Sequence, residues 1–131
     1  MAKLIGSVDL LGRPLVRVRP GGQDDDLLAI VDTGFNGEIM MGMHAARALR
    51  VLLFPDAVDV ELGTGAVERV LEGRLPVRWL DEERVAKVLV SVGWPAPKPD
   101  TPVALIGTRL LRPHLLLVDF AAGTVEIESH D

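Results

Sequence analysis

The sequence alternates short runs of Val, Leu and Ile with glycine and proline along its whole length. It contains 13 glycines and 9 prolines, and no long apolar stretch that would suit an extended helix. This texture is typical of strands joined by turns. We therefore predict an all-β fold. A chain of 131 residues can bury one modest core, so we expect a single domain that spans residues 1–131.

Segments of strand length are recognised by alternating or continuous apolar residues. The expected strands are Lys3–Leu11, Leu15–Arg19, Leu27–Val31, Val58–Leu62, Ala66–Leu71, Leu75–Leu80, Arg84–Val92, Leu115–Phe120 and Thr124–Glu128. Residues 81–83 are expected to form the turn between the strands on either side of them. Two segments are rich in helix formers or end at a proline, and they predict short helices at Met43–Leu49 and Thr108–Leu111.

Composition bears on location and partners. The net charge is −5 and no basic cluster is visible along the sequence, so a nucleic-acid partner is not expected. No run approaches the roughly 18 to 20 apolar residues of a membrane span, so no membrane association is expected. The sequence has no cysteine, and its first residues do not resemble a secretory signal. A cytoplasmic protein is the default expectation.

The apolar run Leu27–Val31 ends abruptly at Asp32-Thr33-Gly34. This carboxylate follows a buried strand and precedes a small polar residue and a glycine. We therefore expect it to lie at a sharp turn of the backbone, where it is accessible to a substrate. Two carboxylates that share a proton can activate water and protonate a peptide carbonyl. The chain holds one such triplet, so a two-fold homodimer is the simplest way to supply the second carboxylate. The alternative is that Asp32 only caps a turn.

The segment Ile30–Gly34 resembles the active-site motif of aspartic peptidases, and Leu105-Ile106-Gly107 resembles the apolar-apolar-glycine element of that family. With the Gly63-Thr64-Gly65 hairpin between them, nearly the whole chain is similar to the single-domain retropepsin-like family, including its bacterial and archaeal members. The resemblance implies a closed barrel with one or two short helices, a two-fold homodimer and a peptide or protein substrate.

The same resemblance assigns roles to individual residues. Asp32 would be catalytic, Thr33 would hydrogen-bond across the dimer, and Gly34 would leave room for the loop. Gly63, Thr64 and Gly65 would form a flap over the substrate, and Ile106 and Gly107 would support the catalytic loop from below. The implied reaction uses a water between two Asp32 carboxylates, without cofactor, metal or covalent intermediate. Because the two carboxylates share a proton, activity should fall at high pH.

Phe35 departs from the family pattern, which usually has Ala or Ser at this position. Its ring could narrow the cleft, alter specificity or pack outward. A peptide-binding or dimerisation module that keeps the fold without efficient catalysis is therefore the alternative function.

Other reaction types have little support in the sequence. His44, His114 and His130 are far apart and no cysteine accompanies them, so no metal site is expected. The sequence lacks a Gly-x-Ser-x-Gly elbow and a phosphate-binding loop. Arg112 and His114, on either side of Pro113, are interpreted as the exposed end of a helix.

Overall fold

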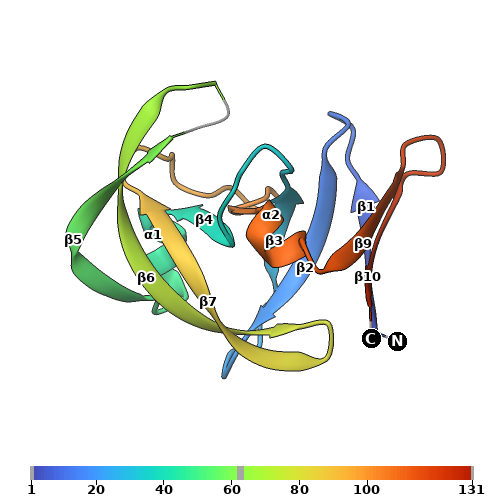
Figure 1. Ribbon diagram of the computed structural model, residues 1–131, viewed down its shortest axis with the longest axis horizontal. Helices are drawn as coiled ribbons and strands as arrows, with labels where there is room; N and C mark the ends of the chain where they lie inside the picture. The colour runs from blue at the N-terminus through green and yellow to red at the C-terminus, as the bar shows by residue number, and fades with distance from the viewer. Residues whose placement is uncertain (1, 62–63, 131) are drawn as a thin grey trace.

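The computed structural model describes residues 2–61 and 64–130. These residues form a largely β structure with two short helices (Figure 1). Its elements are β1 (Lys3–Val8), β2 (Pro14–Pro20), β3 (Leu27–Val31), β4 (Ile39–Gly42), α1 (Met43–Ala48), β5 (Leu52–Glu61), β6 (Val67–Trp79), β7 (Glu82–Ser91), β8 (Ala104–Ile106), α2 (Thr108–Leu111), β9 (His114–Asp119) and β10 (Thr124–Ser129). No helix among these residues is both long and apolar enough to cross a membrane.

Six of the strands close into a barrel. Their hydrogen-bonded order is β6-β7-β4-β8-β3-β2. The barrel is closed by the pairing of β2 with β6, in which Arg19 lies opposite Arg78 and Pro20 lies opposite Val77. Two pairs are parallel, β3 with β8 and β4 with β7, and the other neighbours are antiparallel. The predicted all-β fold, a closed barrel with two short helices, is confirmed.

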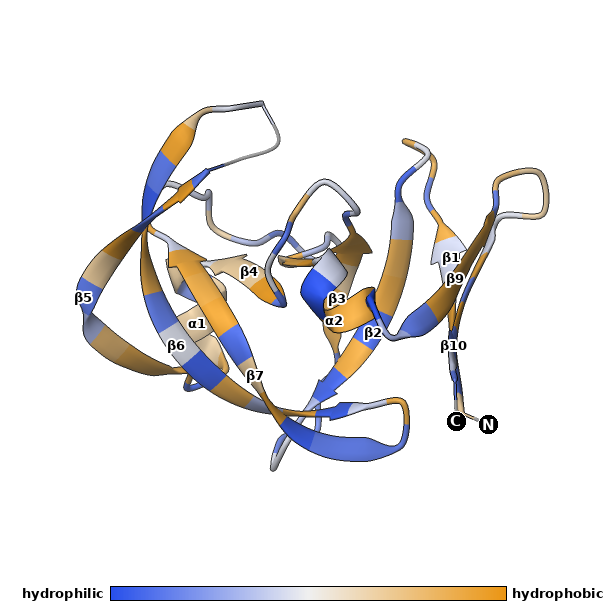
Figure 2. Ribbon diagram, viewed as in Figure 1, coloured by the Kyte–Doolittle hydropathy of each residue, from blue (hydrophilic) through white to orange (hydrophobic). Residues whose placement is uncertain are grey.

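The barrel encloses the main hydrophobic core. Alternate residues of β2, β6 and β7 point inward, as the period of a strand requires, and Figure 2 shows the resulting bands of apolar and polar residues along these strands. The most deeply buried large side chains include Val18, Ile39, Leu75, Val88 and Ile106, each at most 1% exposed. Burial of these side chains stabilises the barrel.

Outside the barrel, β5 extends the described sheet from β6, and three further strands continue it from β2 in the order β1-β10-β9. Lys3 lies opposite Glu128, so the two ends of the described chain are neighbours (Figure 1). β1 and β10 each have partners on both sides, whereas β9 pairs with β10 alone. β9 and β5 are therefore the two edge strands of the described sheet.

The sequence predicted some elements to the residue and missed others. β3 and α2 have the predicted limits, and α1 differs by one residue. β4 was missed because its four residues, all buried, carry no alternation. The predicted strands 66–71 and 75–80 are wrong as separate elements, because β6 runs through Gly73 without a break. The turn before β7 is at Leu80 and Asp81, both with positive φ, rather than at 81–83.

Leu75 provides a test of barrel closure, because it is 1% exposed on the part of β6 that leads back to β2. We expect Leu75→Ala to lower the free energy of unfolding by about 2–5 kcal/mol through lost burial and a cavity. Urea denaturation followed by circular dichroism measures this change. Leu52→Ala, at a leucine that is 65% exposed, is the control and should change stability by less than about 1 kcal/mol. Equal effects of both substitutions would contradict the described barrel interior.

Candidate functional site

Asp32 lies at the end of β3, where the strand leaves the barrel. The parallel pairing of β3 with β8 continues one step beyond Val31, because the Asp32 N–H donates to the Ile106 carbonyl at 2.9 Å. This bond fixes the backbone of Asp32 to the apolar-glycine element that the sequence analysis paired with it. The Asp32 side chain is half-buried, whereas Thr33 and Gly34 are exposed.

The carboxylate of Asp32 is held by its own loop. Its Oδ1 accepts the Gly34 N–H at 2.9 Å. A Cβ atom at Gly34 would lie 3.2 Å from that same oxygen, closer than a comfortable contact, so glycine suits this position. A turn-capping aspartate would make the same bond. The surroundings of the carboxylate therefore matter more than the bond itself.

Residues 106–109 hold the loop that follows Asp32. The N–H groups of Gly107, Thr108 and Arg109 donate to the carbonyls of Glu38, Phe35 and Gly37 at 2.9, 2.8 and 3.1 Å, as a helix start can do with its unpaired donors. These residues connect the two motifs by backbone hydrogen bonds at several points. The loop is thus positioned by the barrel and α2 rather than by its own contacts alone.

Gly107 permits this close approach. A Cβ at this position would lie 2.3 Å from the Gly37 carbonyl oxygen and 2.6 Å from the Phe35 ring. No side chain fits there without moving the loop. Ile106, fully buried, packs in the main core directly before it.

Phe35 packs inward, which answers the question left open by its sequence. It is 7% exposed and forms a second apolar cluster with Met40, Val70 and Leu89. Its ring also covers Gly37, where a Cβ would meet it at 2.5 Å. The ring does not pack outward. It lies under the loop and also lines the space beside Asp32.

A cavity of about 240 Å³ opens next to Asp32, and we call it the Asp32 cavity. Its walls come from the loop, from β4 and β8, from the connection after β7, and from the facing strands β5 and β6. It is lined by Asp32, Gly34, Phe35, Met40, Glu61, Glu68, Trp94 and Leu105. An aspartate that only caps a turn has no need of such a cavity.

The β5–β6 hairpin supplies one wall of the Asp32 cavity, but not through the residues expected from the sequence. Thr64 and Gly65 are exposed and do not line it, and Gly63 lies outside the described residues. Glu61 and Glu68, which precede and follow the tip, line it instead. The sequence analysis missed both glutamates. The exposed residues on either side of Glu68 give the alternation of a strand. This alternation does not identify the residues of other strands that lie near Glu68.

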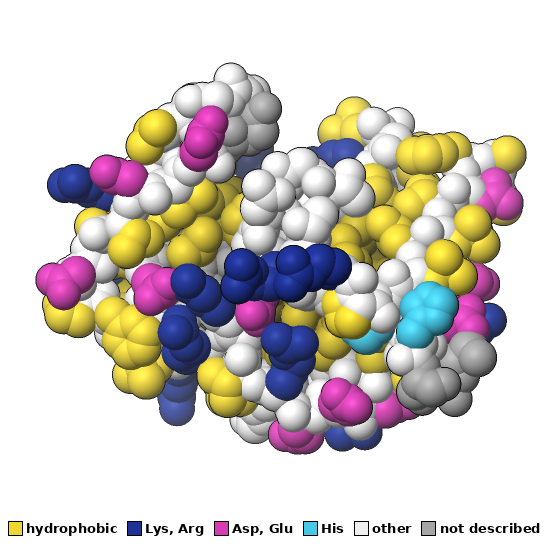
Figure 3. All heavy atoms as spheres, viewed as in Figure 1, with side chains coloured by type: hydrophobic (Ala, Val, Ile, Leu, Met, Phe, Trp, Pro, Cys, Tyr) yellow, Lys and Arg dark blue, Asp and Glu magenta, His cyan; other side chains and the backbone are white. Residues whose placement is uncertain are grey.

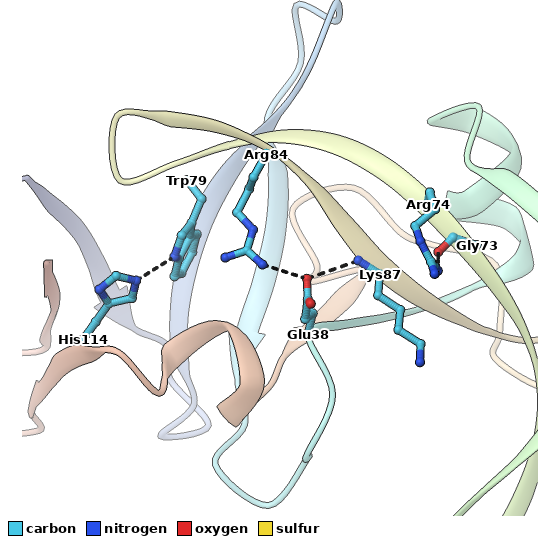
Figure 4. Close-up of polar contacts among 7 residues, drawn as sticks. All are labelled: Glu38, Gly73, Arg74, Trp79, Arg84, Lys87 and His114. Atoms are coloured by element: carbon cyan, nitrogen blue, oxygen red, sulfur yellow. Dashed lines mark hydrogen bonds and ion pairs between the residues drawn. The ribbon is translucent and has the colours of Figure 1, made fainter.

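Basic side chains gather on the face formed by β6, β7 and α2, where Figure 3 shows a band of Lys and Arg. The expectation that no basic cluster exists is therefore wrong. Figure 4 shows two members of the band near one carboxylate: Arg84 donates to Glu38 Oε1 at 3.2 Å, and the backbone N–H of Lys87 donates to the same atom at 3.2 Å. The basic residues are separated along the sequence, so only folding brings them together.

Glu72 is a second carboxylate of this face. The Lys87 ammonium lies 2.7 Å from it and Arg74 lies 3.9 Å from it. The hydrogen bond from Lys87 holds the pKa of the Glu72 carboxyl below its usual range. Glu72 therefore stabilises the folded state at a pH above its pKa in the unfolded chain. This stabilisation is lost as the pH falls through the lowered pKa of the folded state.

His114 and Arg112 do not lie at the Asp32 cavity. The Trp79 Nε1–H donates to His114 Nε2 at 3.3 Å (Figure 4), which gives this histidine a packing role between β6 and β9. Arg112 is exposed at the end of α2, as interpreted from the sequence. Within residues 2–61 and 64–130, no group of three or more His, Asp or Glu side chains is placed to hold a metal ion.

No protein-family model matches this sequence, and no curated protein matches it. Solved structures do match. A retropepsin-like aspartic protease from Rickettsia conorii superposes with a TM-score of 0.63 at 16% identity, over 97% of this chain and 90% of that chain. EIAV protease in complex with the inhibitor HBY-793 superposes with a TM-score of 0.53 at 18% identity, over 79% of this chain and 89% of that chain.

These similarities establish the retropepsin-like fold that the two sequence motifs predicted. The bacterial type of the resemblance is consistent with the Rickettsia structure. At 16–18% identity, the match concerns the fold and not the chemistry of individual residues.

Gly107→Ala tests the support of the loop. We expect it to lower the free energy of unfolding by about 1–3 kcal/mol, because the new methyl group collides with backbone and with Phe35. Chemical denaturation measures the change. Gly93→Ala is the matched control, since its nearest atom would be Ser91 Oγ at 4.0 Å. A Gly107→Ala protein as stable as the control would contradict the described contact.

Proposed function

We propose that this chain, which has the retropepsin-like fold, is an aspartic-type endopeptidase that acts as a homodimer. The observation that carries the proposal is the position of Asp32, on a loop held by residues 106–109 and facing a cavity under the β5–β6 hairpin. Both similar structures are described as proteases, which supports the same class of activity here.

In this proposal, each protomer contributes one Asp32 carboxylate to a shared site. One proton is held between the two carboxylates. The ionised carboxylate takes a proton from the bound water as the water oxygen attacks the peptide carbonyl carbon, and the protonated carboxyl gives its proton to the carbonyl oxygen. The tetrahedral intermediate then collapses, and the amine leaves after it has taken up a proton. No covalent bond to the enzyme forms.

The neighbouring residues have supporting roles. Thr33 is exposed beside Asp32, so its hydroxyl is accessible to a second protomer. Gly34 gives the Asp32 carboxylate its hydrogen bond and its space. Ile106 and Gly107 hold the loop. Thr64 and Gly65 belong to the proposed flap, and the strands β5 and β6 provide the walls that contact substrate.

The β9 edge is the surface through which we propose that two copies associate. Its outward positions Leu115 and Leu117 are 51% and 55% exposed, and Ile5, on the neighbouring part of the same terminal sheet, is 59% exposed. An open edge with exposed apolar side chains is a template for pairing with another chain. Antiparallel pairing of β9 with its two-fold mate satisfies both edges at once.

Asp32→Asn tests the catalytic assignment. We expect cleavage of an unfolded protein to fall by at least about a thousandfold, the order found when a catalytic group is removed, while dimer and fold are retained. Cleavage is followed by mass spectrometry over a range of pH, at concentrations where sedimentation shows both proteins to be dimeric. Wild-type activity should fall at high pH, as the shared proton is lost.

The outcomes separate the two candidate functions. Equal cleavage by Asp32→Asn and wild type would exclude Asp32 as the catalytic group. A wild-type dimer that binds peptides but cuts none of them at any pH would favour the peptide-binding module, in which Phe35 marks the departure from the usual catalytic sequence.

Leu117→Asp tests the association surface. A charge in the centre of the paired edges should raise the dimer dissociation constant by at least about tenfold, because a buried unpaired carboxylate is costly. Analytical ultracentrifugation measures the constant, and activity per protomer should fall with it. Leu52→Asp places the same charge on the other edge strand, β5, and should leave the dimer intact. If Leu52→Asp dissociates the dimer and Leu117→Asp does not, the dimer interface lies at β5 and not at β9.

A further inference from the structure

Glu68 is the residue of the Asp32 cavity whose environment the proposed reaction does not explain. It lies on β6 directly opposite Val60, and its side chain is half-buried. Its Oε1 accepts a hydrogen bond from the hydroxyl of Ser91. Of the residues that the structure describes, Ser91 is the only polar one classed as buried, with no exposed surface.

Ser91 is arranged to hold the Glu68 carboxylate in place. Its hydroxyl proton is donated to Glu68, and its oxygen accepts the Gly93 N–H at 3.4 Å. A buried hydroxyl that both donates and accepts is satisfied and cannot easily turn elsewhere. The carboxylate is therefore oriented by a neutral group, and its negative charge is not compensated by that contact.

The charges around Glu68 differ from those around Glu38 and Glu72, which are also half-buried. Glu38 and Glu72 lie within ion-pair distance of Arg84 and of Lys87 with Arg74, respectively. Within the described chain, Glu68 makes no ion pair, and no Lys or Arg lines the Asp32 cavity. A second cavity on the other side of Glu61 contains both Lys87 and Arg109. The Asp32 cavity therefore differs from this neighbouring cavity in that no cation lines it.

Glu61 adds a further carboxylate to the lining, and the other side chains around the Asp32 cavity, apart from Asp32 itself, are apolar. Phe35, Met40, Trp94 and Leu105 face the same space as Glu68. Long basic side chains bury an aliphatic stem against such surface while they place their charge on a polar group, and an aromatic ring adds a cation–π contribution. At about 240 Å³ the cavity is smaller than the roughly 300–1,000 Å³ of drug-sized sites, which suits one side chain.

We propose that the Asp32 cavity accepts a lysine or arginine side chain of a bound peptide, with Glu68 as its counter-ion. The inference rests on the proposed function in that it places a peptide beside Asp32. A cation in the cavity gives the half-buried Glu68 carboxylate a charged partner, which it lacks among the described residues. The consequence for the proposed peptidase is a preference for basic residues next to the cleaved bond.

Binding and cleavage test this inference separately. Decapeptides with Lys, Arg or norleucine scanned through their central positions are titrated into the Asp32→Asn protein, so that no peptide is cut. Norleucine has the stem of lysine without its charge. We expect Lys or Arg at one position to bind about tenfold more tightly than norleucine, the order of one charge-assisted hydrogen bond. Glu68→Gln in the same background should abolish the difference, and Glu68→Asp should restore part of it.

Glu82→Gln is the matched control, because it removes the same charge from an exposed position on β7. It should leave the preference for Lys or Arg unchanged. Equal binding of the lysine and norleucine peptides would overturn the proposal without the need for any variant at Glu68, as would a preference that persists in Glu68→Gln.

Cleavage of a peptide mixture by the wild-type protein gives the second readout. Cuts beside Lys or Arg that disappear in Glu68→Gln, while cuts beside apolar residues continue, would support the proposal. Cleavage with no basic preference would overturn it and leave the peptidase intact. A charge preference in binding without any cleavage would support the cavity assignment and reject the peptidase.

Discussion

The hydrogen bonds between residues 106–109 and the loop after Asp32 are the contacts on which the arrangement of the site depends. β8 lies between β3 and β4, so its end is next to both ends of the loop. The N–H groups that follow β8 have no other strand to pair with, and the loop carbonyls have no helix of their own. Each set satisfies the other, which keeps buried polar groups from being left unpaired. The loop is therefore fixed to the end of β8 and to α2 by backbone hydrogen bonds.

This contact imposes conditions on side chains that are far apart in sequence. Gly107 must lack a Cβ because the Gly37 carbonyl and the Phe35 ring occupy the space, and Gly37 must lack one because it lies against the same ring. Phe35 in turn fills the region between the loop and the second apolar cluster. The Phe35 ring and the two glycines depend on each other, because a side chain at Gly37 or Gly107 would collide with the ring. A large residue next to the Asp32 motif is thus compatible with the fold because it is buried beneath the loop.

Charge is distributed on this molecule in a way that its net value of −5 does not reveal. One face carries a basic band whose members pair with Glu38 and Glu72, while the Asp32 cavity holds carboxylates and no cation among the described residues. Local fields of this kind, rather than total charge, determine which groups a site attracts. The difference between the two regions arises because adjacent residues of a strand face opposite sides. Arg69 and Glu68 are consecutive, and only Glu68 faces the Asp32 cavity.

The sequence by itself determined the fold class and the limits of β3 and α2, because strand periodicity and glycine placement are local properties. The pairing of the Asp32 motif with Leu105-Ile106-Gly107 came from the resemblance to the retropepsin-like family. The sequence did not reveal β4, whose four buried residues lack a period, or the single course of β6. Glu68, Ser91 and the basic band could not be predicted either. Their neighbours come from strands that meet only when the barrel closes, and contacts across a barrel depend on register, which a single sequence does not encode in any one segment. The direction of Phe35 was likewise decided by the tertiary structure, since the space beneath the loop exists only after β8 and α2 have packed against it.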